Sequence, residues 1–217
     1  MNLGLRTMQA EDIEEVLEIE KEAFSPLWPG TSFKRQLSNR YSSYLVAYDS
    51  LVESQVAPID QYEISRQEGP WLETFFHAIK NIFKNPSPDT QSLQKLAGYV
   101  GVWFQGNEAH ITEIAVREGL RGLGIGELLL IGSIRSATKY GSTVVTLEVR
   151  VSNFIAQRLY EKYGFSTAGI RKGYYSDNRE DALIMTTSPI HTPDYQSQFD
   201  LLQQAYADRG RSIYISE

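Results

Sequence analysis

The stretch Arg121-Gly122-Leu123-Gly124-Ile125-Gly126 is the part of this chain that decides its fold. It follows the apolar segment Ile111–Val116, which has the pattern of a β-strand, and precedes Glu127–Tyr140, which has the pattern of an α-helix. Glycine has no Cβ atom, so the backbone of this turn can approach an anion closely. The first amide N–H groups of the helix and the positive end of its dipole face that anion. The stretch therefore predicts either a tight strand-to-helix turn or a cradle for a diphosphate group.

Two common nucleotide-binding motifs do not fit the spacing of this turn. The dinucleotide fingerprint requires G-x-G-x-x-G, and Glu127 occupies the position of its third glycine. The P-loop ends in Gly-Lys followed by Ser or Thr, and this ending is absent from the turn. The pattern that remains is Arg-x-x-Gly-x-Gly, which begins at Arg121.

Further motifs surround this turn between Gly98 and Met185. Together with Arg-x-x-Gly-x-Gly, a coenzyme A signature, they make this part of the chain resemble the GNAT acetyltransferase superfamily. The last motifs narrow the resemblance to the RimI-like branch, the ribosomal-protein-alanine N-acetyltransferases. The motifs that carry the resemblance are Gly98-Tyr99-Val100-Gly101, Ala109-His110-Ile111, Ile114-Ala115-Val116, Leu147-Glu148-Val149-Arg150, Ser152-Asn153, Leu159-Tyr160, Gly164-Phe165, Arg171-Lys172-Gly173-Tyr174-Tyr175 and Glu180-Asp181-Ala182.

The resemblance implies an α/β (α+β) protein with the GNAT fold, in which a mixed, mostly antiparallel sheet of about seven strands is flanked by about four helices. Hydrophobic periodicity predicts the same elements. The predicted strands are Leu3–Thr7, Ser43–Asp49, Lys95–Gln105, Ala109–Val116, Thr143–Arg150, Phe165–Tyr174 and Asp181–Thr187. The predicted helices are Ala10–Phe24, Ser32–Asn39, Glu127–Tyr140 and Asn153–Tyr163.

These elements predict a single GNAT domain over residues 1–189, interrupted by an insertion at residues 51–94 and followed by a C-terminal tail, residues 190–217. The insertion is polar and contains proline, apart from one helical stripe of large apolar side chains. We expect this helix to pack onto the parent domain, and the alternative is a helix that binds a partner or a membrane surface. The stripe consists of Trp71, Leu72, Phe75, Phe76, Ile79, Ile82 and Phe83.

Composition excludes several kinds of chemistry. The 217 residues contain no cysteine, so disulfides, thiolate metal sites and a cysteine nucleophile are excluded. The three histidines have no metal-ligand spacing, and we expect no metal site. The formal charge of −6 argues against general nucleic-acid affinity and is compatible with a cationic peptide terminus as partner. No apolar run of membrane-spanning length occurs, so we expect a cytoplasmic protein without a membrane span.

The resemblance implies acetyl-CoA as the acetyl donor. The backbone of Ile114, Ala115 and Val116 would pair with the pantetheine arm, or these residues form only a core strand. The backbone amides of the glycine turn would bind the diphosphate, and Arg121 would contact the same anion or remain a solvated surface charge. Asn153 is placed to cap the following helix, and the family suggests that it also contacts the cofactor. The cofactor residues in the turn are Arg121, Gly122, Leu123, Gly124, Ile125 and Gly126.

Two residues are candidates for acid–base catalysis. Strand alternation separates Glu148 from Leu147 and Val149, so its carboxylate can reach a cleft instead of the core. The resemblance implies that Glu148 is the general base; otherwise it is a surface carboxylate or one paired with Arg150. Tyr160 resembles the tyrosine that GNAT enzymes use as general acid, although a helical tyrosine more commonly packs in a core. Tyr163 shares part of the same helix face and is the competing candidate.

The resemblance implies an acceptor as well: the N-terminal α-amine of a protein, most simply an alanine-initiated ribosomal protein. Trp28, Tyr174 and Tyr175 would flank the acceptor peptide, or they are ordinary core and surface aromatics. Direct transfer is expected because no cysteine is available to carry the acyl group. The alternatives are an acetyltransferase for lysine side chains or small amines, and a non-catalytic module that binds acetyl-CoA or another partner.

Overall fold

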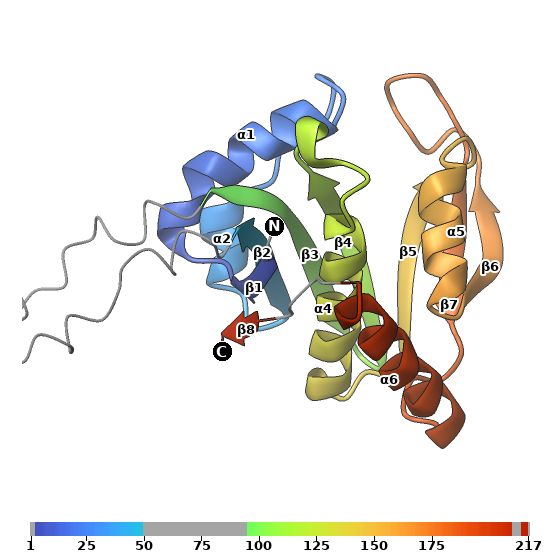
Figure 1. Cartoon of the computed structure of the whole chain (residues 1–217). Coiled ribbons are helices and arrows are strands. Elements are labelled where there is room, and N and C mark those ends of the chain that lie inside the picture. The colour runs from blue at the N-terminus through green and yellow to red at the C-terminus, as the bar shows by residue number, and fades with distance from the viewer. Residues whose placement is uncertain (1–2, 50–94, 210–213, 217) are drawn as a thin grey trace, which may run out of the picture.

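A single open sheet organises the molecule (Figure 1). The computed structural model describes residues 3–49, 95–209 and 214–216. Eight strands lie in the order β6-β7-β5-β4-β3-β2-β1-β8. β4 and β5 are parallel, β8 is parallel to β1, and the other neighbours are antiparallel. The strands are β1 (Leu3–Thr7), β2 (Ser42–Asp49), β3 (Leu96–Gln105), β4 (Glu108–Val116), β5 (Val144–Arg150), β6 (Phe165–Arg171), β7 (Ala182–Thr187) and β8 (Tyr214–Ser216).

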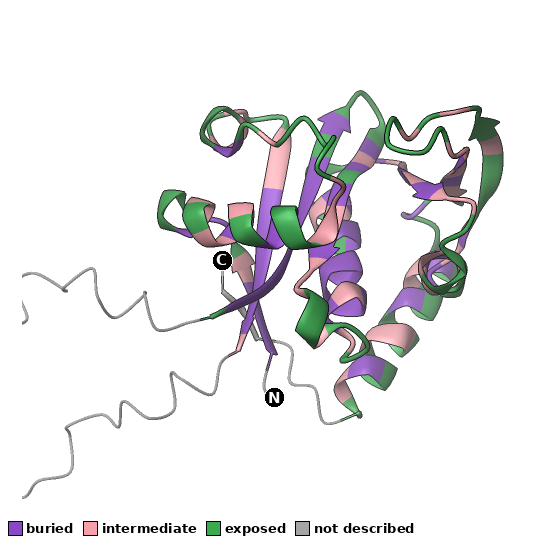
Figure 2. Ribbon diagram, turned by 90° about the horizontal axis from the view of Figure 1, so that it is seen from above, coloured by how far each residue is buried: buried purple, intermediate pink, exposed green. Residues whose placement is uncertain are grey.

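Helices cover both faces of the sheet, and each face has its own core. Two clusters of buried side chains result, which we call the α4 face and the α1 face. On the α4 face, α4 (Ile125–Tyr140), α5 (Phe154–Lys162) and α6 (Pro193–Ala207) pack on the sheet. On the α1 face, α1 (Ile13–Ala23) and α2 (Phe33–Leu37) pack over β2, β3 and β4. Figure 2 shows the buried residues concentrated in the central strands and in α4.

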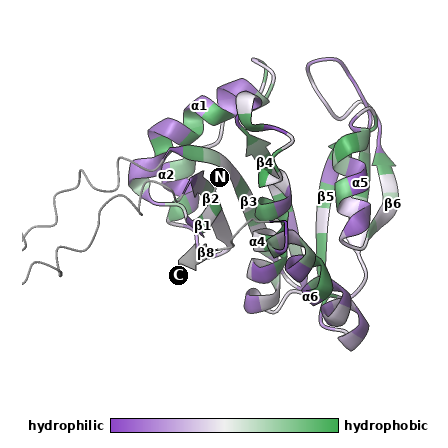
Figure 3. Cartoon of the chain, in the orientation of Figure 1, coloured by the Kyte–Doolittle hydropathy of each residue, from purple (hydrophilic) through white to green (hydrophobic). Residues whose placement is uncertain are grey.

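The sequence pattern explains why these segments form these elements. α4 is almost wholly apolar along its first three turns and is the most deeply buried helix, whereas α1 has one apolar side and one acidic side. In β5, Leu147 and Val149 are buried in the α4-face core, so Glu148 between them projects to the α1 face. Figure 3 shows hydrophobic residues along β4 and β5 and hydrophilic ones over much of α1.

The seven strands and four helices expected from the sequence are all present, with ends that shift by a few residues. The largest shifts are three residues: β6 ends at Arg171 instead of Tyr174, and α1 begins at Ile13 instead of Ala10. The segment expected only as a tail after residue 189 adds two elements, α6 and β8. Short helical turns also occur at Ala10–Asp12 and Glu118–Leu120. The insertion at residues 51–94, with its predicted helical stripe, lies outside the described residues.

Candidate active site

β4 and β5 separate in the middle of the sheet. Their parallel pairing runs only from Glu108 opposite Val144 to Ile111 opposite Leu147. Beyond Ile111 the register of β4 against β3 shifts, and the chain continues to Val116 paired with β3 alone among the described strands. The edge of β4 from Thr112 to Val116 that faces β5 is therefore left without a strand partner in this part of the chain (Figure 1). Ile114, Ala115 and Val116, the residues expected at the pantetheine arm, lie on this open edge.

The glycine turn lies at the start of α4, next to the open edge of β4. Gly122 and Gly124 have φ angles of 80° and 86°, a left-handed conformation that favours glycine. Gly124 is the N-cap of α4, and no side chain caps the first amides of the helix, so these donors are available to a ligand. A Cβ atom on Gly126 would meet only Val116, at 3.9 Å, so the fold itself does not require glycine there. Arg121 is exposed and makes no side-chain hydrogen bond or ion pair with a described residue.

Glu127 connects the start of α4 to the two other helices of that face. Its Oε1 atom accepts hydrogen bonds from Lys162 Nζ at 2.6 Å and from Tyr163 at 2.8 Å. Arg209, just after α6, lies 2.9 Å from the same oxygen. Burial alone would raise the pKa of Glu127, but these partners outweigh it and lower the pKa. Tyr206 of α6 also donates to the carbonyl oxygen of Gly124, at 3.3 Å, so α6 supports the glycine turn from behind.

Glu148 lies just beyond Leu147, the last residue of β5 that pairs with β4. Its carboxylate is 7% exposed and lies between two cationic or hydrogen-bonding partners. His110 Nε2 is 3.1 Å from Oε2, and the guanidinium of Arg171 is 2.9 Å from Oε1. The hydrogen bond from His110, together with the charge of Arg171, lowers the pKa of Glu148, so the group is a carboxylate at neutral pH. Arg150 is not its partner, because that side chain pairs with Asp177 and Glu180.

Tyr160 and Tyr163 have different surroundings, although both are buried on α5. The hydroxyl of Tyr163 donates to Glu127, and the backbone carbonyl of Tyr163 accepts from Tyr195 at 3.0 Å. Tyr163 is therefore part of the structural contact between α4, α5 and α6. Tyr160 is 5% exposed, and its hydroxyl makes no hydrogen bond to a described residue. Burial raises the pKa of Tyr160, so its hydroxyl stays protonated.

The other predicted site residues fall in three places. Asn153 caps α5, its side chain accepting from the amide of Ala156 at 3.2 Å. Trp28, in the loop after α1, stacks on Phe24 and donates to Glu20 at 3.1 Å. Tyr174 and Tyr175 are in contact in the loop after β6, with ring centroids 5.2 Å apart. Burial raises the pKa of Tyr174, and the nearby charge of Glu148 adds to it.

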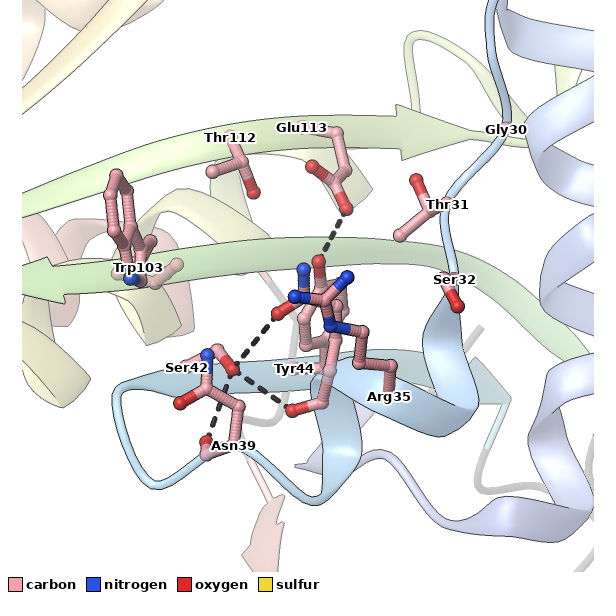
Figure 4. Close-up of a pocket in the computed structure, with 12 residues that line it drawn as sticks. Gly30, Thr31, Ser32, Arg35, Asn39, Ser42, Tyr44, Trp103, Thr112 and Glu113 are labelled. Atoms are coloured by element: carbon pink, nitrogen blue, oxygen red, sulfur yellow. Dashed lines mark hydrogen bonds between the residues drawn. The ribbon is translucent and has the colours of Figure 1, made fainter.

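A pocket that the sequence did not reveal opens on the α1 face of the sheet (Figure 4). It has a volume of about 760 Å³ and extends from the loop before α2 to Trp103 on β3. At its floor, Glu113 of β4 accepts a hydrogen bond from Tyr44 of β2 at 2.8 Å. Burial raises the pKa of Glu113. No sequence signal marks this pair, because the two residues are 69 positions apart and are brought together by β3, which lies between them.

The described residues include no group of three histidine or acidic side chains that could hold a metal ion. Among the same residues, no helix is both long enough and apolar enough to span a membrane.

The amino-acid sequence is similar to those of known acetyltransferases. The model of the acetyltransferase (GNAT) family matches residues 56–165. A protein named putative ribosomal protein bS18-alanine N-acetyltransferase, from Bacillus subtilis, is 35% identical over 183 residues, which cover 84% of this chain and 93% of that protein. An N-alpha-acetyltransferase from Saccharolobus solfataricus is 30% identical over 182 residues, covering 83% and 90% of the two chains.

A solved structure of an N-acetyltransferase also resembles this chain. The ribosomal-protein-S18-alanine N-acetyltransferase from Escherichia coli superposes with a TM-score of 0.60 at 25% identity, covering 88% of this chain and 95% of that one. The separated β4 and β5 and the glycine turn thus occur in a chain that is related to these enzymes over most of its length. This protein belongs to the GNAT acetyltransferase family.

Proposed function

We propose that this protein transfers the acetyl group of acetyl-CoA directly to the N-terminal α-amine of a protein, and that the acceptor is an alanine-initiated ribosomal protein. The names of its relatives from Bacillus subtilis and Saccharolobus solfataricus support N-terminal acetylation. The 217 residues contain no cysteine to carry an acyl-enzyme, which supports direct transfer. A ribosomal acceptor would place the activity in the cytoplasm.

The donor would lie between β4 and β5. Members of the GNAT family use acetyl-CoA. The unpaired backbone edge at Ile114, Ala115 and Val116 offers N–H and C=O groups to the amides of the pantetheine arm. The uncapped amides of Gly124, Ile125 and Gly126 would bind the diphosphate, with Arg121 as an additional cation. Asn153 is the N-cap of α5, the helix that follows β5. Its side-chain amide would contact the cofactor as well as cap the helix.

One observation carries the proposal: the two candidate catalytic residues belong to opposite faces of the sheet. Glu148 projects to the α1 face, whereas Tyr160 belongs to the core of the α4 face. An amine that enters from the α1 face would meet the carboxylate first. A thioester that enters from the α4 face would have its sulfur on the side of the tyrosine. In this arrangement the proton acceptor would serve the amine and the proton donor would serve the thiolate, each from its own side of the sheet.

The chemistry follows from this placement. Glu148 takes a proton from the ammonium form of the acceptor, and the neutral nitrogen attacks the thioester carbonyl carbon. A new C–N bond forms and the C–S bond breaks. Tyr160 gives its proton to the departing thiolate, the second proton lost by the nitrogen returns to Tyr160 through solvent, and Glu148 releases the first proton to water. An α-amine has a pKa of about 7.7–8.0, so only a modest base is needed, whereas a lysine side chain, near 10.4, would require a stronger one.

The acceptor peptide would lie on the α1 face. The loop after α1, which holds Trp28, and the loop after β6, which holds Tyr174 and Tyr175, are at the end of the sheet where β4 and β5 separate (Figure 1). The pocket at Glu113 and Tyr44 opens on the same face and offers room for the residues that follow the first one. The aromatic side chains supply apolar contact area on both sides of the reacting amine.

The experiment that tests this function uses purified protein, acetyl-CoA and a peptide that begins with alanine and contains one internal lysine. Mass spectrometry with fragmentation should locate a single acetyl group on the α-amine. A matched peptide with a blocked N-terminus should remain unmodified. Acetylation of the internal lysine in both peptides would instead show a lysine acetyltransferase.

The non-catalytic alternative is tested by the same material. A library of peptides with all twenty N-terminal residues covers other possible acceptors. If calorimetry detects binding of acetyl-CoA and no peptide in the library is ever acetylated, the protein is a binding module and our proposal is wrong.

A further inference from the structure

Arg150, the last residue of β5, is the centre of a group of contacts that the proposed chemistry does not use. Its guanidinium donates to Asp177 Oδ2 at 2.8 Å and to Glu180 Oε2 at 3.1 Å. It also donates to the side-chain oxygen of Asn178 at 3.1 Å. All three acceptors lie in the loop after β6, residues 172–181. One cation at the end of a strand therefore binds three side chains of one loop.

Arginine side chains also hold the two tyrosines of this loop. The guanidinium carbon of Arg150 is 3.8 Å from the centroid of the Tyr175 ring. The guanidinium carbon of Arg171, at the end of β6, is 5.5 Å from the centroid of the Tyr174 ring. A guanidinium over the face of an aromatic ring is attracted by it. Both aromatic side chains proposed to flank the acceptor peptide are thus oriented by a cation from a neighbouring strand.

The backbone of the loop has an unfavourable conformation that needs such contacts. Arg179 has a φ angle of 58°, and among the described residues no other residue with a side chain has a positive φ. The amide of Arg179 donates to the carbonyl oxygen of Tyr175 at 2.8 Å, and the amide of Tyr175 donates to that of Glu180 at 3.1 Å. A left-handed residue persists only where its surroundings hold it. Arg150 supplies that support, because it contacts both Tyr175 and Glu180.

Arg150 is itself fixed in place by the start of α5. Its backbone carbonyl oxygen accepts from the side-chain amide of Gln157 at 2.9 Å and from the backbone amide of Asn153 at 3.0 Å. Glu180 Oε1 accepts from the backbone amide of Ser152 at 2.9 Å. The hydrogen bonds from Ser152, together with that from Arg150, lower the pKa of Glu180 to about 2, so this carboxylate is charged at neutral pH. The loop is therefore attached to the junction of β5 and α5.

We propose that Arg150 is a positioning residue for the acceptor peptide. It holds the loop after β6 against the end of β5, so that Tyr174 and Tyr175 form one wall of the acceptor site before a peptide arrives. Arg171 links this wall to the catalytic carboxylate, because its guanidinium contacts Glu148 Oε1 at 2.9 Å and faces the Tyr174 ring. The inference rests on the proposed function, in which the peptide lies on the α1 face beside this loop.

A loop that already has its binding shape makes acceptor binding less costly. When the binding-competent conformation is only partly populated, the apparent Kd rises by the inverse of its population. Removal of the guanidinium releases three side chains and the Tyr175 ring together, so fewer molecules present the wall to a peptide. The proposed donor site keeps its shape, because it is built from the edge of β4 and from the glycine turn. The loss therefore falls on the acceptor and not on acetyl-CoA.

The test compares two variants of the full chain in peptide acetylation. Arg150→Met keeps a long side chain and removes the guanidinium. We expect the KM for a peptide that begins with alanine to rise about 10-fold, with kcat at saturating peptide within about twofold of wild type. The Kd of acetyl-CoA, measured by calorimetry, should not change. Lys172→Met is the matched control, because Lys172 pairs with Asp181 of the same loop at 2.6 Å but is 80% exposed, and this variant should keep the wild-type KM.

Two further variants separate positioning of the loop from a general loss of stability. Asp177→Ala should raise the KM by a smaller factor, and it should add nothing in the Arg150→Met background, because both changes break the same contact. Arg150→Lys keeps the charge without the planar fork, so its KM should lie between those of wild type and Arg150→Met.

Trypsin reports on the loop directly. Arg179 is exposed, and cleavage after it tracks the population of the open loop. At a temperature at which thermal unfolding shows every protein folded, cleavage after Arg179 should be faster in Arg150→Met than in wild type or in Lys172→Met.

The outcomes separate the role of Arg150 from the function on which it rests. A wild-type KM in Arg150→Met, or an equal loss of acetyl-CoA affinity, overturns the positioning role alone. If Arg150→Met does not fold, Asp177→Ala at an exposed residue decides, and an unchanged KM there overturns the role. If the wild-type protein acetylates only an internal lysine, the proposed acceptor is wrong, and the same KM comparison with the lysine peptide judges Arg150. If wild type acetylates no peptide, both proposals are wrong.

Discussion

At the scale of single residues, Glu148 is distinguished by its partners. Many strand glutamates are solvated, but this one is held by His110 from β4 and Arg171 from β6, and it lies where β4 and β5 lose contact. Because both partners stabilise the ionised form, the pKa of Glu148 lies below its ordinary value. The carboxylate therefore stays ionised through neutral pH, and it can accept a proton from the acceptor amine there.

We predict that Glu148→Gln lowers kcat by about 10²–10⁴-fold near pH 6.5, the usual contribution of a general base. The loss should be smaller at pH 9, because the amine is then mostly neutral and needs no base. The measurement is a pH profile of peptide acetylation for both proteins. An equal loss at all pH values would indicate a binding role for Glu148 and would contradict the assignment.

Tyr160 and Tyr163 should respond to loss of their hydroxyls in opposite ways. Tyr160→Phe removes the proposed proton donor, so kcat should fall about 10²-fold with unchanged stability. Tyr163→Phe removes the hydrogen bond to Glu127, so the free energy of unfolding should fall by about 1–2 kcal/mol with kcat preserved. Denaturant unfolding and steady-state kinetics on the two variants decide the assignment, and the reverse pattern would exchange their roles.

At the scale of elements, the turn before α4 combines two properties in one short segment. Its glycines adopt left-handed backbone conformations, and the helix that follows starts without a side-chain cap. A side chain at Gly124 would strain the turn and would also stand among the amides that face the proposed diphosphate.

We predict that Gly124→Val weakens acetyl-CoA binding at least 10-fold while the protein remains folded. Gly106→Val is the matched control, because Gly106 has a φ of 58° in the β3–β4 turn and its Cβ would meet no atom within 4 Å. Both variants should lose about 1–2 kcal/mol of stability through left-handed strain. Calorimetry should show normal acetyl-CoA affinity only for Gly106→Val. Normal affinity in a folded Gly124→Val protein would remove the turn from the binding site.

The contacts of Glu127 predict a pH-dependent stability. Its pKa is lowered in the folded state, so its contribution is fully present above its ordinary value of 4.5 and is lost as the pH falls through the folded pKa. Glu127→Gln should therefore lower the free energy of unfolding by about 1 kcal/mol at pH 7, a low figure because Lys162 and Arg209 are partly exposed. The difference from wild type should shrink below pH 4. Glu161→Gln, at an exposed position on α5, should show no such trend.

At the scale of the whole molecule, the C-terminal segment is part of the core. Tyr195, Phe199 and Tyr206 of α6 are buried in the α4-face cluster, and β8 extends the sheet beyond β1. The helix also reaches the glycine turn, through the bond from Tyr206 to Gly124 and the pairing of Arg209 with Glu127. The end of the chain thus stabilises the turn that we assign to the cofactor, although the two segments are about 80 residues apart.

We predict that Phe199→Ala lowers the free energy of unfolding by about 3–5 kcal/mol, as expected for a large side chain removed from a core. Leu201→Ala on the same helix is the control, because Leu201 is 72% exposed and should change stability by less than about 0.5 kcal/mol. Urea unfolding of both variants gives the comparison. Equal stability of the two variants would mean that α6 does not pack against the sheet.

The sequence by itself determined the elements and their faces. Periodicity placed every strand of the sheet up to β7 and the helices α1, α2, α4 and α5, because an amphipathic segment can bury only one side. The same local logic put Glu148 on the face opposite Leu147 and Val149, and it marked the glycine turn before α4. These properties depend on residues that are neighbours along the chain, so a sequence contains them directly.

Only the tertiary structure decided which side chains meet. His110 contacts Glu148 because β4 pairs with β5 in this register. Arg171 contacts Glu148 because β6 pairs with β7, which in turn pairs with β5. The same is true of Tyr44 and Glu113 in the pocket.

We expected only a tail beyond residue 189, although Tyr195, Phe199 and Tyr206 recur at helical spacing. The structure shows that these aromatic side chains of α6 pack in the α4-face core. Such contacts depend on strand register and helix packing, which are properties of the assembled sheet and not of any local segment.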